Sequence, residues 1–203
     1  MPVTAIVPLK ALMLSKQRLA PDLSAGERRA LMRQLFAGVL RACRDADTVG
    51  QVIAVVGDDE GFNLARAIGI TALREPGGGL NAAIDFATAQ LPPGTTSLVI
   101  VADLPDVTVA DVDAVVAAGR HDPGVVVAAT HDGGTGALLR QPAAIIPPAF
   151  GAASAAAHLT AARRAGVRAA LIRLPGLAHD IDAVADLSGY AVTTTTGAHA
   201  RDL

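Results

Sequence analysis

Asp103 is the carboxylate whose place in the sequence points most directly to chemistry. It follows an uninterrupted apolar run, Leu98 to Ala102, and Pro105 stops strand pairing two residues later. Such a run between turn formers is typical of a strand buried on both faces of a sheet. Ligands of open α/β sheets bind beyond the carboxyl ends of the strands, where a carboxylate could hold a hard cation such as Mg²⁺. The alternative is that Asp103 only caps a turn.

Three basic side chains, Lys10, Lys16 and Arg18, follow the first apolar run of the chain, Val3 to Val7. If that run is a strand, these side chains lie beyond its end and could contact a polyphosphate. For any one of them, a solvated charged loop is the simpler interpretation. The sequence has no G-x-x-x-x-G-K-[ST] pattern, so this segment is not a P-loop.

A second group of carboxylates lies near the end of the chain, in G-L-A-H-D-I-D-A-V-A-D-L. Asp180 and Asp182 alternate in this segment, so in an extended chain they face the same side. The segment follows a predicted strand over Val167 to Leu174. Because that strand carries two arginines, we expect it to lie near an edge of the sheet.

Glycines precede a predicted helix that starts near Asn81. Gly77 to Gly79 would let the backbone approach a ligand closely, and the amino end of a helix attracts anions. The alternative is a flexible loop in which Asn81 is the N-cap. The pattern is not G-x-G-x-x-G, so a Rossmann dinucleotide site is not supported.

Two reactive residue types have simple structural interpretations. His158 is a lone histidine on a predicted helix over Ser154 to Gly166, with Ser154 as its N-cap, and is expected to be structural rather than catalytic. Cys43 lies on the apolar face of a helix that starts at Ser24, where Glu27 completes a capping box. No base is placed beside Cys43, so the sequence offers no cysteine nucleophile.

The composition narrows the class of protein. Of the 203 residues, 51% are hydrophobic but only 2% aromatic, and the formal net charge is −2. That charge gives no electrostatic argument for binding nucleic acid or an anionic membrane surface. A single cysteine excludes an internal disulfide, and neither a signal peptide nor a transmembrane run is evident. We therefore expect a soluble cytoplasmic protein, and a homodimer is compatible with the sequence.

Strands alternate with helices along the whole chain, which predicts one three-layer α/β domain with a mainly parallel sheet. No linker divides residues 1–203, and the tail, about 193–203, is expected to be frayed after a terminal helix that opens at Asp186. The further expected strands are short apolar runs, Val52 to Val56, Thr71 to Leu73, Val125 to Ala129 and Ala137 to Arg140.

Several motifs together resemble a known family. They are V-P-L-K and K-Q-R-L-A-P near the start, V-A-D-L-P in the middle, F-G-x-x-S-x-x-x-H, and D-x-D-x-x-x-D-L near the end. In this order, across nearly the whole chain, they resemble the guanylyltransferases of coenzyme F420 biosynthesis, which act on 2-phospholactate or phosphoenolpyruvate. That family belongs to a wider nucleotidyltransferase group, which includes the molybdenum-cofactor guanylyltransferase. The resemblance implies a nucleotidyltransferase fold, GTP and a three-carbon phospho-acid as substrates, and Mg²⁺ as cofactor.

The resemblance also implies roles for matching positions. Asp103 and Asp180 would be the Mg²⁺ ligands, with Asp182 the weaker candidate, and Lys16 would join the two aspartates in catalysis. The nucleotide side would comprise Pro8, Leu9, Lys10, Lys16, Arg18, Gly79, Leu80 and Asn81. The carboxylate of the small acceptor would lie near Thr135, Gly136, Gly151 and Ser154.

Two departures from the family pattern bear on the acceptor and on the late motif. Many members carry Asn or Thr where Gly136 stands, so one side-chain contact to the acceptor is absent here. Many carry D-x-D-T-P, whereas Ala183 and Val184 follow Asp182. The alternatives are another nucleotidyltransferase, with a sugar-phosphate or molybdopterin acceptor, and a nucleotide-binding module without turnover.

Overall fold

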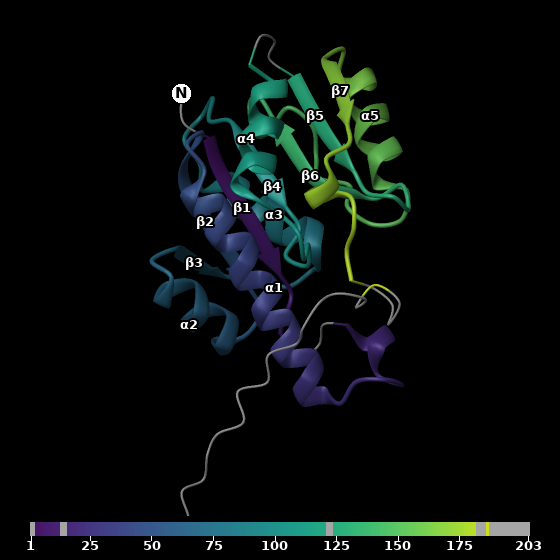
Figure 1. The fold of residues 1–203 in the computed structure, drawn as a ribbon. Helices are drawn as coiled ribbons and strands as arrows, with labels where there is room; N and C mark the ends of the chain where they lie inside the picture. Colours follow the sequence, from purple (N-terminus) through teal and green to yellow (C-terminus); the bar gives the residue numbers. More distant parts are fainter. Residues whose placement is uncertain (1–2, 13–15, 121–123, 182–185, 187–203) are drawn as a thin grey trace, which may run out of the picture.

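A seven-stranded sheet forms the centre of the fold, in the strand order β3-β2-β1-β4-β6-β5-β7 (Figure 1). The computed structural model describes residues 3–12, 16–120, 124–181 and 186. Within them, β6 runs antiparallel to β4 and β5, and the other neighbouring strands are parallel. The strands are β1 (Val3–Leu9), β2 (Val49–Val56), β3 (Thr71–Arg74), β4 (Ser97–Ile100), β5 (Gly124–Ala129), β6 (Thr135–Arg140) and β7 (Arg168–Ile172).

Strand β4 lies between β1 and β6, and all four of its residues are buried. Leu98 and Ile100 belong to one core cluster and Val99 to the other, so the strand contributes to both faces. The prediction of a strand buried on both faces is therefore confirmed. Strand β4 ends at Ile100 rather than at Ala102, the end of the apolar run. The Val101 N–H nevertheless donates to the Gly136 carbonyl on β6 at 3.0 Å.

Helices cover both faces of the sheet, which confirms the predicted three-layer α/β fold. α1 (Ala25–Asp45), α2 (Asp59–Ala67) and α4 (Val109–Ala118) pack on one face, with the short helices η1 (Gln17–Leu19) and η2 (Pro175–Leu177). α3 (Leu80–Ala89) and α5 (Ser154–Arg164) pack on the other. The edge position expected for the last strand is also confirmed, because β7 ends the strand order.

Helix α1 forms where its sequence predicts. Ser24 Oγ accepts the N–H of Glu27 at 3.2 Å, and the Glu27 carboxylate accepts the N–H of Ser24 at 2.8 Å. Cys43 lies on its buried face, fully inaccessible, and burial raises the pKa of its thiol to about 12. The cysteine is thus an inert core residue, as predicted.

The predicted N-cap Ser154 is wrong, and so is the alternative in which Asn81 is an N-cap. Ala153, in a left-handed conformation, is the N-cap of α5, and Ser154 is the first residue of the helix. Gly79 rather than Asn81 is the N-cap of α3. Both polar side chains instead bind groups outside their own helix, as described below.

Asp182, the remainder of the predicted terminal helix after Asp186, and the tail about 193–203 lie outside the described residues. Within the described residues, no helix is both long and apolar enough to cross a membrane.

Candidate active site

A cavity of about 560 Å³ opens where β1 and β4 end and β6 begins. Because β6 is antiparallel, its amino end reaches the same edge of the sheet as the carboxyl ends of β1 and β4. Most of the predicted site residues line this cavity: Pro8, Leu9, Lys10, Lys16, Arg18, Leu80, Asp103, Thr135, Gly151, Ser154 and Asp180. The structure therefore gathers residues from segments far apart in the sequence at one place.

Asp103 and Lys16 meet inside the cavity. Lys16 Nζ lies 2.6 Å from Asp103 Oδ2, and the lysine side chain is only 4% exposed. Lys16 adopts a left-handed backbone conformation, with φ 57°, directly before η1. Non-glycine residues adopt this conformation at a cost, and such residues cluster at functional sites. The contact shows that Lys16 is an inward-facing residue and not part of a solvated loop.

Asp180 is held at the cavity by the chain on either side of it. Leu177 and Ile181 are both fully buried in the core, and the Ala178 carbonyl accepts the His131 N–H at 2.8 Å. The late carboxylate thus lines the same cavity as Asp103, although 77 positions separate them. Asp103 follows the end of β4 closely, whereas Asp180 follows η2 and not the end of β7 directly.

Gly136 lies outside the cavity lining and serves the packing of η2 instead. A Cβ at this position would lie 2.1 Å from the Leu177 carbonyl oxygen, so a side chain would force the two segments apart. The glycine therefore lets η2 pack against β6, and η2 leads directly to Asp180. The side-chain contact expected from Asn or Thr in relatives has no room in this backbone arrangement.

Asn81 does not line the cavity but holds a loop that does. Its side-chain amide donates to the Phe150 carbonyl at 3.1 Å and accepts the Phe150 N–H at 2.8 Å. Phe150 and Gly151 both line the cavity, so Asn81 fixes the backbone of that loop. Gly79, next to the lining residue Leu80, is likewise absent from the lining.

Sequence reasoning missed Asp132, a third carboxylate in the cavity lining. Its oxygen accepts the Thr130 hydroxyl and the Gly134 N–H, and these bonds lower the pKa of the carboxyl below its usual value. The sequence signal was the turn H-D-G-G-T-G, which predicts a turn aspartate but not its place in the cavity.

The cavity lining carries balanced charge. Among the described residues it includes three carboxylates, Asp103, Asp132 and Asp180, and three basic residues, Lys10, Lys16 and Arg18. Polyanionic substrates would therefore need further positive charge. Within the described residues, no group of three or more His, Cys, Asp or Glu could hold a metal ion. Mg²⁺, however, is commonly bound by one or two carboxylates together with substrate phosphates, which the pair Asp103 and Asp180 fits.

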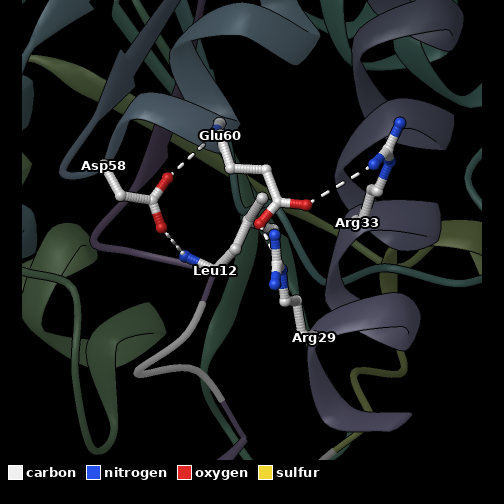
Figure 2. Close-up of polar contacts among 6 residues, drawn as sticks. Leu12, Arg29, Arg33, Asp58 and Glu60 are labelled. Carbon is white, nitrogen blue, oxygen red and sulfur yellow. Dashed lines mark hydrogen bonds and ion pairs between the residues drawn. The ribbon is translucent and has the colours of Figure 1, made fainter. Parts of the chain in front are cut away.

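Asp58 anchors the segment that leads to the basic side chains (Figure 2). One carboxylate oxygen caps α2 through the Gly61 N–H at 2.8 Å, and the other accepts the Leu12 N–H at 2.7 Å. The neighbouring Gly57 allows the chain to approach closely, because a Cβ there would lie 1.5 Å from the Lys10 carbonyl oxygen. The end of β1 is thereby tied to the start of α2.

If the cavity binds a nucleotide, as the family resemblance implies, replacing Asp58 by Asn is expected to raise the KM for nucleotide several-fold, as for loss of a hydrogen bond worth about 1 kcal/mol. Asn still caps α2, so the melting temperature should change little, but its amide has only one acceptor oxygen for two N–H groups. Steady-state kinetics with varied nucleotide measures the effect. Glu60→Gln is the matched control, because Glu60 pairs with Arg29 and Arg33 on α1 and not with Leu12. A nucleotide KM equal in both variants would contradict the anchoring role.

Solved structures share this fold. A protein from Desulfovibrio desulfuricans described as a nucleotide-diphospho-sugar transferase superposes with a TM-score of 0.77 over 99% of this chain and 91% of its own, at 16% identity. CMP:2-keto-3-deoxy-manno-octonic acid synthetase, solved with CTP, gives 0.61 over 92% of this chain and 96% of its own, at 11% identity. The chain therefore has the α/β nucleotidyltransferase fold.

Sequence comparison identifies the family. Residues 3–202 match the family described as guanylyl transferase CofC like. The chain is 40% identical to the phosphoenolpyruvate guanylyltransferase of Sphaerobacter thermophilus, over 98% of this chain and 97% of the relative. It is 35% identical to the 3-phospho-D-glycerate guanylyltransferase of Phenylobacterium zucineum, over 88% and 84%. The chain belongs to the CofC-like guanylyl transferase family and is a nucleotidyltransferase enzyme.

Proposed function

We propose that this protein transfers GMP from GTP to a three-carbon phospho-acid and releases pyrophosphate, as a step in coenzyme F420 biosynthesis. The observation that carries the proposal is the arrangement of the cavity. Basic side chains, Lys16 and Arg18, line it together with the carboxylates Asp103 and Asp180 and the hydroxyls of Thr135 and Ser154. The lining thus offers groups for a triphosphate, a cation and a small acid.

The reaction needs no nucleophile from the protein. An oxygen of the acceptor's phosphate attacks the α-phosphorus of GTP, the bond to the bridging oxygen of pyrophosphate breaks, and pyrophosphate leaves. Catalysis of such transfers consists mostly of positioning and charge stabilisation. The inert, buried Cys43 is therefore no obstacle.

The residues of the chain divide this work between them. Lys16 and Arg18 would offset charge on the β- and γ-phosphates, including the charge that develops on the leaving pyrophosphate. Thr135 and Ser154 would hold the acceptor. Asp103 and Asp180 would hold Mg²⁺, which when bound offsets the charge of the two anions and polarises the α-phosphate.

Phosphoenolpyruvate is the first acceptor to test, because a relative named for it is 40% identical to this chain. The 3-phospho-D-glycerate enzyme at 35% identity makes phosphoglycerate the second, and 2-phospholactate completes the panel. We also propose that the enzyme acts in the cytoplasm, where nucleoside triphosphates are available.

The deciding experiment measures pyrophosphate release from GTP and Mg²⁺ with each acceptor in turn, and identifies the product by mass spectrometry. Release is expected only when a phospho-acid is present. Parallel reactions with ATP and CTP test the base, and a sugar 1-phosphate tests the alternative acceptor class. Equal release without acceptor, or none with any of the three acids, would contradict the proposal.

A further inference from the structure

A buried side-chain network lies directly behind the acceptor side of the cavity. His158, on α5, is fully buried, and its Nε2 accepts the Ala149 N–H at 2.9 Å. Its Nδ1 lies 3.1 Å from Thr135 Oγ1, and Ser154 Oγ lies 3.0 Å from that same Thr135 oxygen. Thr135 and Ser154 line the cavity, so the network connects the core histidine to the cavity wall.

The backbone fixes the tautomer of His158. A backbone N–H can only donate, so Nε2 must be the unprotonated nitrogen of the ring. In a neutral imidazole the proton then lies on Nδ1, which makes Nδ1 a donor toward Thr135. Burial, and next the nearby positive charge of Arg140, lower the pKa of His158 to about 4, so the ring is neutral at pH 7.

This tautomer determines what the two hydroxyls can do. Thr135 cannot donate to Nδ1, so the pair has two hydroxyl protons and a single hydrogen bond between them. One proton is left over, whichever hydroxyl carries it. The hydrogen bonds of the described residues include no other acceptor for it within the protein. With the opposite tautomer, Thr135 would donate to Nδ1 and Ser154 to Thr135, and no proton would remain.

We propose that His158 is a positioning residue that makes the Thr135–Ser154 pair a hydrogen-bond donor toward the cavity, where it binds an anionic oxygen of the acceptor. The inference rests on the proposed function, because it assigns the acceptor's carboxylate to this wall. In this role the bond from Nδ1 to Thr135 matters for acceptor binding, whereas a purely structural role needs only the bond from the Ala149 N–H to Nε2.

Two amide substitutions separate these roles, because each retains one half of the imidazole. In His158→Gln the amide lies near the place of Nε2 and can still accept from Ala149, but the donor to Thr135 is lost. The surplus hydroxyl proton remains, but no N–H on the His158 side now directs it toward the cavity. In His158→Asn the amide lies near the place of Nδ1 and can still donate to Thr135, while the Ala149 N–H loses its acceptor.

We expect His158→Gln to raise the KM for the acceptor on the order of ten-fold, the loss typical of one hydrogen bond to a charged oxygen. The KM for GTP should stay near that of the unmodified enzyme. His158→Asn should retain the acceptor KM and show a lower melting temperature. Thr135→Val, which removes the hydroxyl at similar size, should reproduce the defect of His158→Gln. The double variant should be no worse than either single variant, because both remove the same contact.

The alternatives give different results. A histidine that only supports the loop predicts the reverse order, with His158→Asn defective and His158→Gln normal. That order, equal defects in both variants, or normal acceptor kinetics in both would overturn the inference. If the unmodified enzyme releases no pyrophosphate with any acceptor, the proposed function fails instead, so the two failures are distinguishable.

Discussion

Asp103→Asn and Asp180→Asn are each expected to lower turnover by about three orders of magnitude, since loss of metal-assisted charge stabilisation removes several kcal/mol from the transition state. Both carboxylates line one cavity, and Asp180 is fixed there by the buried Leu177 and Ile181. Asn preserves the size of each side chain, so circular dichroism should show the fold retained in both variants. The melting temperature of Asp103→Asn should fall, because the buried Lys16 loses its ion pair with Asp103. If Asp103 only capped a turn, Asn would be close to neutral for activity.

The double variant tests whether the two carboxylates act as a unit. Residues that serve one function share one loss, so the double variant should be little worse than either single variant. Turnover is measured across Mg²⁺ concentration, where a weakened site should recover partly at high concentration. Calorimetric titration with Mg²⁺ provides a readout that does not depend on turnover.

Asp132→Asn is the matched control, because Asp132 lines the same cavity, but its Oδ1 is held within its own turn by Thr130 and Gly134. We expect its turnover to fall much less than in the other two variants. Turnover near that of the unmodified enzyme in either Asp103→Asn or Asp180→Asn would contradict a shared metal site.

Features set by neighbouring residues could be predicted from the sequence. The capping box of Ser24 and Glu27 depends on three-residue spacing, and the buried strand β4 on an unbroken apolar run. The rule that ligands bind beyond the carboxyl ends of strands also predicted Asp103 as a site residue, and Asp103 lines the cavity. In each case a local pattern determines the structure directly.

Features set by distant partners could not be predicted in this way. Ser154 has the residue type of an N-cap, yet Thr135 on β6 binds its hydroxyl. Asn81 binds the backbone of Phe150, 69 positions away. These contacts depend on the order of the strands and on the antiparallel direction of β6, and hydrophobic periodicity encodes neither. In both cases a hydrogen bond to a distant partner replaces the N-cap hydrogen bond that the residue type favours.

Lys16→Met is expected to raise the KM for GTP by about ten-fold to a hundred-fold, the range for losing a hydrogen bond between charged groups. Met keeps the unbranched apolar stem of this buried side chain and removes its terminal ammonium group. The KM for the acceptor should change less, because the proposed function assigns the basic segment to the nucleotide. Kinetics with each substrate varied in turn measures both values.

Lys10→Met is the control for Lys16, because Lys10 lines the same cavity but is exposed to solvent. Exposed charges contribute little, so its GTP dependence should change only slightly. The ion pair between Lys16 and Asp103 defines the competing explanation, in which Lys16 only orients the carboxylate. That explanation predicts a higher Mg²⁺ requirement in Lys16→Met with an unchanged GTP dependence. A phosphate contact predicts the altered GTP dependence even at saturating Mg²⁺, so the two substrate titrations decide between them.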